Sequence, residues 1–118
     1  MASPKIGRRV RGSTTGRPVM VLLDAIGRRW ALRVLWELRS GEELTFRALR
    51  TACAEVSPSV LNERLAELRE LVLVEQGEAG YRLTRDGLGL MALLAPVDAW
   101  AERWASRLAQ SVLLRFVR

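Results

Sequence analysis

The stretch from Val56 to Gln76, VSPSVLNERLAELRELVLVEQ, decides the fold of this chain. It opens on a helix-start signal, because the oxygen of Ser57 can accept an orphan N–H and Pro58 needs no N–H donor in the first turn. The apolar residues that follow at helical spacing are Leu61, Leu65 and Leu68, with Val60 and Leu71 at the margin. The stretch therefore predicts an amphipathic helix that buries one face and ends in a short apolar strand.

The residues before this stretch predict three short helices. Pro18–Ile26 predicts the first helix, which Gly27 ends. RRWALRVLWELRSG predicts the second, and Gly41 stops it; its expected buried face holds Trp30, Leu32, Val34, Leu35 and Leu38. A brief extended piece at Leu44–Thr45 precedes the third helix. The second and third of these helices, together with the helix from Pro58, make three helices before a strand, which is typical of a helix-turn-helix core.

The residues after it predict a hairpin and more helix. LVLVEQ and GYRLT predict two strands around GEAG. Thr84 is placed to cap a helix, in which Gly87 and Gly89 allow close packing. A last helix is predicted from Pro96 to Arg118. The expected fold class is mainly α with a small β-hairpin wing, a winged helix-turn-helix with N- and C-terminal dimerisation helices.

The excess of positive charge lies at the N-terminus. Of the net charge of +6, residues 1–17 contribute +5, because they hold five basic and no acidic residues. These residues are interpreted either as a flexible basic arm that binds phosphates or enters a minor groove, or as a terminus whose arginines only aid solubility. The arm's candidate DNA contacts are Arg8, Arg9 and Arg11. The expected domain at 18–118 includes a C-terminal dimerisation helix at about 96–118.

Composition excludes several classes of protein. One cysteine and no histidine exclude a disulfide framework and an ordinary zinc site. The sequence has no apolar run long enough for a membrane span and no signal peptide, so a cytoplasmic protein is expected. Without histidine, clustered carboxylates or a phosphate-binding loop, we expect neither an enzyme nor a bound cofactor.

Four stretches, in their order and spacing, resemble the HxlR-type transcriptional regulators of the MarR-like winged-helix group. They are PVMVLLDAIGRRWALRVLWEL, VSPSVLNERLAELRELVLV, YRLTRDG and LLAPVDAWAERW. The resemblance implies a bacterial homodimer that binds a pseudo-palindromic operator in double-stranded DNA. It also implies that the helix from Pro58 enters the major groove, that the wing lies near the minor groove, and that the first and last helices form the dimer.

The sequence departs from the family pattern at several positions. Arg17 stands where the family often has a cysteine that some members use as a sensor, which puts thiol sensing by that route in doubt. Cys53 falls where the family tends to have an apolar residue, which favours a buried structural cysteine. Arg47 and Ala48 replace the usual cap of the third helix, so the cap is lost or shifts to Thr45. The GEAG wing is shorter than the family's.

The candidate base contacts are polar residues of the helix that starts at Pro58. They are Ser57, Ser59, Asn62, Glu63 and Arg64. Asparagine suits adenine, glutamate can accept from cytosine N4, and arginine suits guanine or a phosphate. Arg64 lies at the edge of the apolar stripe, so a second interpretation pairs it with an acid beside the core.

The same helix is net negative between Pro58 and Leu71, so basic side chains outside this helix must neutralise the phosphates. The candidates outside the arm are Arg47, Arg50, Arg82 and Arg85. The expected dimer interface is a separate apolar set: Val19, Leu22, Leu23, Val97, Trp100, Trp104, Leu108 and Val112.

The four tryptophans have two interpretations. They pack in the core and the dimer, or Trp30, Trp36 and Trp100 line a ligand pocket for a small planar effector. The leading hypothesis is a dimeric, sequence-specific DNA-binding transcriptional regulator. The alternative is a winged-helix dimer that acts in protein–protein interaction or small-molecule sensing, with weak or lost DNA binding.

Overall fold

The computed structural model describes residues 4–11 and 14–117. The elements in chain order are α1 (Pro18–Ile26), α2 (Ala31–Glu37), α3 (Phe46–Ala52), α4 (Pro58–Glu70), β1 (Val74–Gln76), β2 (Tyr81–Leu83) and α5 (Arg85–Val117). The chain divides into two units, one that ends at Leu88 and one that begins at Gly89. The winged helix-turn-helix fold expected from the sequence is confirmed.

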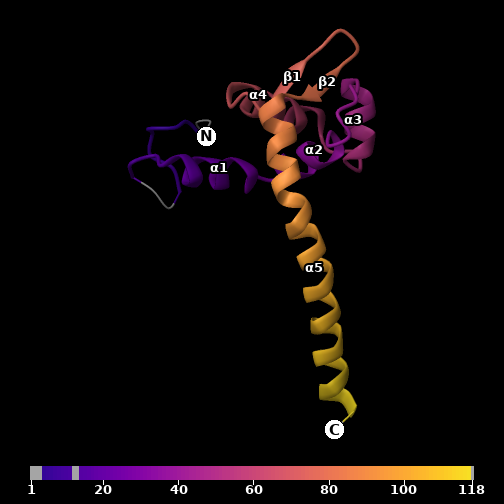
Figure 1. Ribbon diagram of the computed structural model, residues 1–118. Coiled ribbons are helices and arrows are strands. Elements are labelled where there is room, and N and C mark those ends of the chain that lie inside the picture. Colours follow the sequence, from indigo (N-terminus) through magenta and orange to yellow (C-terminus); the bar gives the residue numbers. More distant parts are fainter. Residues whose placement is uncertain (1–3, 12–13, 118) are drawn as a thin grey trace. The chain divides into compact units, whose positions relative to one another are not determined.

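The core of the first unit lies between α2, α3 and α4, which gather beside the hairpin (Figure 1). Leucines and valines at helical spacing fill it, because that spacing brings them to one face of each helix. The fully buried side chains include Val34, Leu35, Leu38, Leu49, Leu61, Leu65 and Leu68. The predicted buried face of the helix that starts at Pro58 is therefore correct.

Three local caps fix where helices begin. Ser57 Oγ accepts from Val60 N–H at 3.2 Å and begins α4. Thr45 Oγ1 accepts from Ala48 N–H at 3.1 Å, so the cap of α3 does shift to Thr45. Thr84 Oγ1 accepts from Gly87 N–H at 3.0 Å at the start of α5. Each cap satisfies an N–H that has no partner within its helix.

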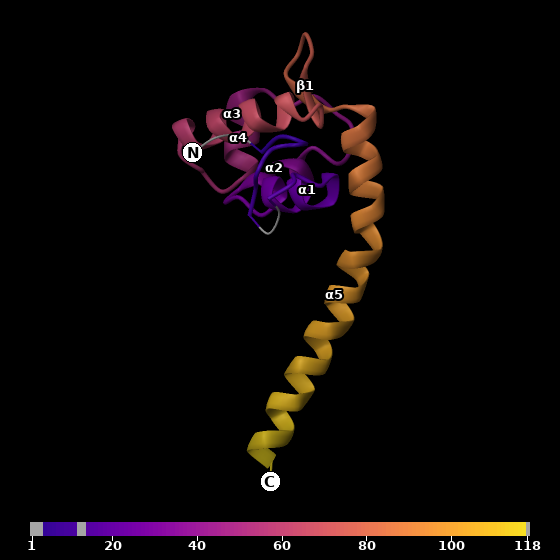
Figure 2. The same cartoon turned by 90° about the vertical axis from the view of Figure 1, so that its left-hand side faces the viewer.

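The wing is a two-stranded antiparallel hairpin with a short extension. Val74 pairs with Leu83, Glu75 with Arg82, and Gln76 with Tyr81. Tyr81 also exchanges two backbone hydrogen bonds with Leu44, of 2.9 and 2.7 Å, which ties the predicted extended piece to the wing. In both views the tip of the hairpin extends beyond α3 and α4 (Figures 1 and 2).

Helix α2 differs from the expectation in two respects. Trp30 precedes the helix at φ 73° and is half-buried, so it is not part of the helical face. Leu32 is 42 % exposed, although its apolar side chain predicted burial. The helix begins only at Ala31, so the buried face runs through Ala31, Val34, Leu35 and Leu38 instead.

The predicted helix start at Pro96 is wrong, because α5 is one helix of 33 residues with Pro96 inside it. Proline costs an interior helix one hydrogen bond, and the flanking segment LMALLA consists of strong helix formers that keep the helix continuous. Gly87 does allow close packing, since a Cβ there would overlap the Leu73 carbonyl oxygen, whereas Gly89 has open space. Among the described helices, none is both long and apolar enough to cross a membrane.

Candidate nucleic-acid interface

The turn between α3 and α4 sets the direction of α4. Ala54 and Glu55 both have left-handed φ values, 55° and 62°, which cost roughly 1–2 kcal/mol per residue for side chains with a Cβ. Hydrogen bonds hold this conformation: Glu55 N–H donates to the Arg50 carbonyl at 3.0 Å, and Arg50 Nε donates to the Val56 carbonyl at 2.7 Å. Arg50 therefore shapes the turn, and its guanidinium also pairs with the Glu55 carboxylate at 3.5 Å.

The outer face of α4 carries four of the five candidate base contacts. Ser57, Ser59, Asn62 and Glu63 are all exposed, and they begin at the capped N-terminus of the helix. The hydroxyls of Ser57 and Ser59 lie 3.5 Å apart. A rigid, capped helix that presents an amide, a carboxylate and hydroxyls to solvent has the donors and acceptors that reading base edges requires.

A groove beside this face contains Arg47. A cavity of about 350 Å³ lies between α3 and the start of α4, lined by Phe46, Arg47, Arg50, Thr51, Glu55 and Pro58. Arg47 is exposed there. The structure thus brings a cation of α3 next to the N-terminus of α4, where the helix dipole also favours an anion.

Three candidate phosphate or base contacts have partners within the protein. Arg64 donates to the Arg29 carbonyl at 2.9 Å and to Glu67 at 2.7 Å, and its side chain is only 14 % exposed. Arg82 pairs with Glu43 at 3.4 Å and Glu75 at 3.3 Å. Arg50 holds the turn. Of the two interpretations of Arg64, the structure supports the pairing with an acid beside the core.

The N-terminal residues that the structure describes make defined contacts. Gly7 N–H donates to the Gly16 carbonyl at 3.0 Å, and Pro4 is buried. Arg11 pairs with Asp24 of α1. The Arg11 guanidinium, and more weakly that of Arg28, holds the pKa of Asp24 below its usual range although burial opposes this. Arg8, Arg9 and Arg11 are all exposed, and Arg11 differs in that its guanidinium is paired with Asp24.

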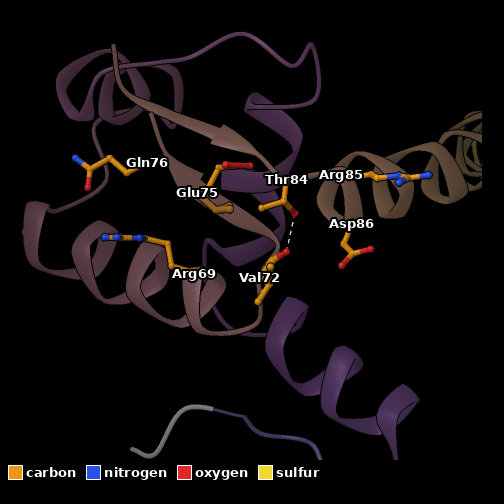
Figure 3. Close-up of a pocket in the computed structure, with 8 residues that line it drawn as sticks. Arg69, Val72, Glu75, Gln76, Thr84, Arg85 and Asp86 are labelled. Carbon is orange, nitrogen blue, oxygen red and sulfur yellow. Dashed lines mark hydrogen bonds between the residues drawn. The ribbon is translucent and has the colours of Figure 1, made fainter. Parts of the chain in front are cut away.

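The root of the wing holds a second cavity, of about 500 Å³ (Figure 3). Thr84 Oγ1 donates to the Val72 carbonyl at 2.6 Å and joins the end of α4 to the start of α5. Arg69 and Arg85 extend in opposite directions in this view, and Glu75 and Asp86 share the lining. The lining of this cavity consequently mixes acidic and basic side chains, and Arg85 is an exposed cation near the wing.

The second unit presents an apolar stripe, which we call the α5 stripe. It consists of Leu93, Val97, Trp100, Trp104, Leu108 and Val112. These residues recur every three or four positions and so share one face. Each is 46–73 % exposed, and together they span about 29 Å of helix. In α1, Val19 and Leu23 are similarly exposed, and Leu22 is half-buried.

Three cavities of the first unit are lined without any tryptophan. Trp100 and Trp104 stack on each other with ring centroids 5.9 Å apart and planes 12° apart. Trp36 is covered by the Arg39 guanidinium at 4.3 Å. The wing-root cavity, the groove beside α3, and a third cavity between the N-terminal segment and the end of α4 contain no tryptophan. A pocket made by Trp30, Trp36 and Trp100 stays a prediction.

Cys53 is fully buried at the end of α3. Burial, and secondarily the nearby Glu37 carboxylate, raises the pKa of its thiol. The thiolate is the reactive form, so the thiol is a poor nucleophile at neutral pH. The predicted burial of this cysteine is confirmed.

Sequence reasoning missed two residues near α4. Thr51 is exposed and lines the groove with Arg47; its position one turn after Arg47 on the same helix face is a signal that could have found it. Arg28 contacts Glu67 of α4 at 3.1 Å. No local pattern reveals that pair, because 39 residues separate its members.

A short helix, a sharp turn, a polar-faced second helix and a hairpin wing define a winged helix-turn-helix protein of the DNA-binding kind. The model of the HxlR-like helix-turn-helix family matches residues 25–109, most of the chain. The chain therefore belongs to the HxlR-like family. The family and the solved structures below are transcriptional regulators rather than enzymes.

Solved structures that are similar to this chain include two forms of one transcriptional regulator and a MarR-family protein. Quinone-bound YodB from B. subtilis is 28 % identical, over 73 % of this chain and 97 % of that one, with a TM-score of 0.67. A reduced form of the same protein, described as a transcriptional regulator, is 26 % identical with a TM-score of 0.64 over 73 % and 91 % of the two chains. A MarR-family regulator from Enterococcus faecalis shares the fold: it is 24 % identical, over 86 % and 98 % of the two chains, with a TM-score of 0.69.

Proposed function

We propose that this DNA-binding transcription regulator acts as a homodimer that reads a pseudo-palindromic operator. The observation that carries the proposal is the exposed, capped outer face of α4, with Ser59, Asn62 and Glu63 supported from behind by a fully buried leucine face. In this arrangement α4 enters the major groove and the hairpin lies near the minor groove. The exposed α5 stripe supplies the surface for the second copy.

The net negative charge of α4 is compatible with this proposal. Glu67 is 5 % exposed and paired with arginines, so it is a structural acid and does not face the DNA. Cations outside α4 therefore supply the phosphate contacts. The exposed candidates are Arg47 beside the helix start, Arg85 after the wing, and Arg8 and Arg9 of the N-terminal segment.

Two substitutions test the roles of Asn62 and Arg47. Asn62→Ala should lose about 1–3 kcal/mol of binding free energy for the operator and relax the base preference at one position of each half-site.

Arg47→Ala should weaken binding to the operator and to an unrelated duplex alike, and it should reduce the log–log salt slope by about 1. Fluorescence anisotropy at several salt concentrations measures both. Equal losses on both duplexes for Asn62→Ala would reject base reading by this residue.

The N-terminal segment should contribute through Arg8 and Arg9. Replacing both with glutamine should reduce the salt slope by about 0.9 for each phosphate that the segment no longer neutralises. This variant tests the two arginines more specifically than a deletion of residues 1–17 would, because it leaves the Arg11–Asp24 pair in place. Replacement of Arg103 and Arg107, two exposed residues of α5, makes the same change in charge elsewhere and serves as the control. An unchanged slope in the Arg8/Arg9 variant would eliminate the arm as a DNA contact.

A small planar effector is a second candidate role. The similarity to a quinone-bound structure favours it, as does the half-exposed Trp100–Trp104 stack. Binding of a planar molecule against these rings should quench tryptophan fluorescence in a saturable way. A titration with a panel of quinones and related planar compounds measures this, and Trp36→Phe shows whether the first unit contributes. The absence of saturable quenching across the panel would count against an effector at the tryptophans.

A further inference from the structure

A cluster of buried charges lies behind α4, on the side opposite to Asn62. Glu67 accepts from Arg28 at 3.1 Å and from Arg64 at 2.7 Å. Arg28 also contacts Asp24 at 3.4 Å. The four side chains are only 5–14 % exposed. They are therefore shielded from the solvent that weakens surface ion pairs.

This cluster joins α4 to one short segment, the connection between α1 and α2. The side chain of Arg28 reaches Glu67, and the backbone carbonyl of Arg29 accepts from Arg64 at 2.9 Å. Two adjacent residues of the connection thus hold two residues of α4 that lie one turn apart. Asp24 in turn holds Arg28 from α1, four residues earlier along the chain.

The two kinds of contact behind α4 constrain it differently. The leucine face is held by apolar contacts, which favour burial but have little directionality. Charge-assisted hydrogen bonds are directional, and a planar guanidinium fixes the angle at which a carboxylate approaches it. Rotation of α4 about its axis would break the bonds to Glu67 and Arg64 before it exposed the leucines.

We propose that Arg28 and Glu67 are positioning residues that fix the rotation of α4 and so aim Asn62 and its neighbours at the base edges. Neither residue touches DNA in this arrangement. The inference rests on the proposed function, because it requires that the outer face of α4 reads sequence. It predicts that loss of the pair lowers sequence discrimination more than it lowers general affinity for DNA.

Glu67→Gln distinguishes a positioning role from simple electrostatics, because the two predict changes in different quantities. Removal of a negative charge near a polyanion should tighten binding to any duplex. A positioning role predicts instead that the ratio of operator affinity to unrelated-duplex affinity falls about tenfold, the value of one base contact. Glu70→Gln makes the same charge change on an exposed residue of the same helix and should change the ratio less than about twofold.

Arg28→Lys provides a second variant that keeps the charge. A lysine ammonium is a compact point charge and does not fork to two carboxylates as Arg28 does to Asp24 and Glu67. The affinity ratio should fall in this variant also. Each protein is measured well below its own melting midpoint, so that unfolding does not contribute; if Glu67→Gln does not fold, Arg28→Lys decides.

The result expected is a lowered ratio in Glu67→Gln and Arg28→Lys and an unchanged ratio in Glu70→Gln. If the unaltered protein discriminates between duplexes and all three variants match it, the positioning role is overturned while the proposed function stands. If the unaltered protein binds both duplexes equally, the proposed function fails and the inference fails with it.

Discussion

Replacing Trp104 with arginine is expected to turn the proposed homodimer into a monomer. Trp104 lies in the middle of the α5 stripe and is 47 % exposed. Its neighbours on the same face, Trp100 and Leu108, are exposed to a similar degree. An apolar surface of this length usually marks an interface, and aromatic side chains near the centre of an interface contribute most to its free energy. A charged side chain at the centre would be buried without a partner, which costs several kcal/mol.

Light scattering across a range of protein concentrations measures the outcome. Ser106→Arg is the matched control, because it adds the same charge to an exposed position about 180° around the helix from Val97. The control should remain dimeric and bind DNA like the unaltered protein. A Trp104→Arg protein that is folded and dimeric would refute the assignment of the α5 stripe to the dimer interface.

Glu67→Ala is expected to destabilise the first unit by about 3–5 kcal/mol, because it leaves Arg28 and Arg64 buried without their shared acceptor. That is a large part of the roughly 5–15 kcal/mol that typically separates a folded domain from its unfolded chain. Urea denaturation at one fixed protein concentration measures the change, since association would otherwise shift the midpoint.

Glu70→Ala is the control for this second substitution. Glu70 is exposed on the same helix, so its loss should change the free energy of unfolding by less than about 0.5 kcal/mol. If Glu67→Ala costs no more than Glu70→Ala, the buried cluster does not stabilise the fold.

The sequence predicted those features that depend on neighbouring residues. Ser57, Thr45 and Thr84 act as caps because each serves an N–H only three residues ahead. The buried face of α4 follows from the spacing of three leucines. The hairpin follows from two short apolar runs around a glycine-containing turn. Local rules of this kind determine where elements begin and which side of each is apolar.

What the sequence did not predict depends on contacts between distant residues. Leu32 is apolar but exposed, because the turn at Trp30 sets which face of α2 meets the core. Pro96 carries a helix-start signal, yet the residues around it keep α5 continuous. In the sequence, Arg50 and Arg82 have only the signature of surface cations, but each pairs with an acid within the fold.

In the candidate interface, too, the sequence predicts what depends on local spacing and does not predict what depends on distant contacts. Ser59, Asn62 and Glu63 could be assigned to the outer face from helical periodicity alone. The pairing of Arg50 and Arg82 could not be predicted in this way, because nothing in the sequence around them distinguishes a paired arginine from an exposed one. The burial of Glu67 accounts for part of the net negative charge of α4, because this acid is paired within the fold.

Selection from a random duplex library, carried out with the full chain at two salt concentrations, tests the central claim most directly. The account predicts enrichment of an inverted repeat that persists at the higher salt, because base contacts from two copies of α4 depend less on counterion release than phosphate contacts do. Binding that is unselective and disappears at the higher salt would contradict it. Such a result would mean that basic side chains contact DNA without any reading of sequence by α4.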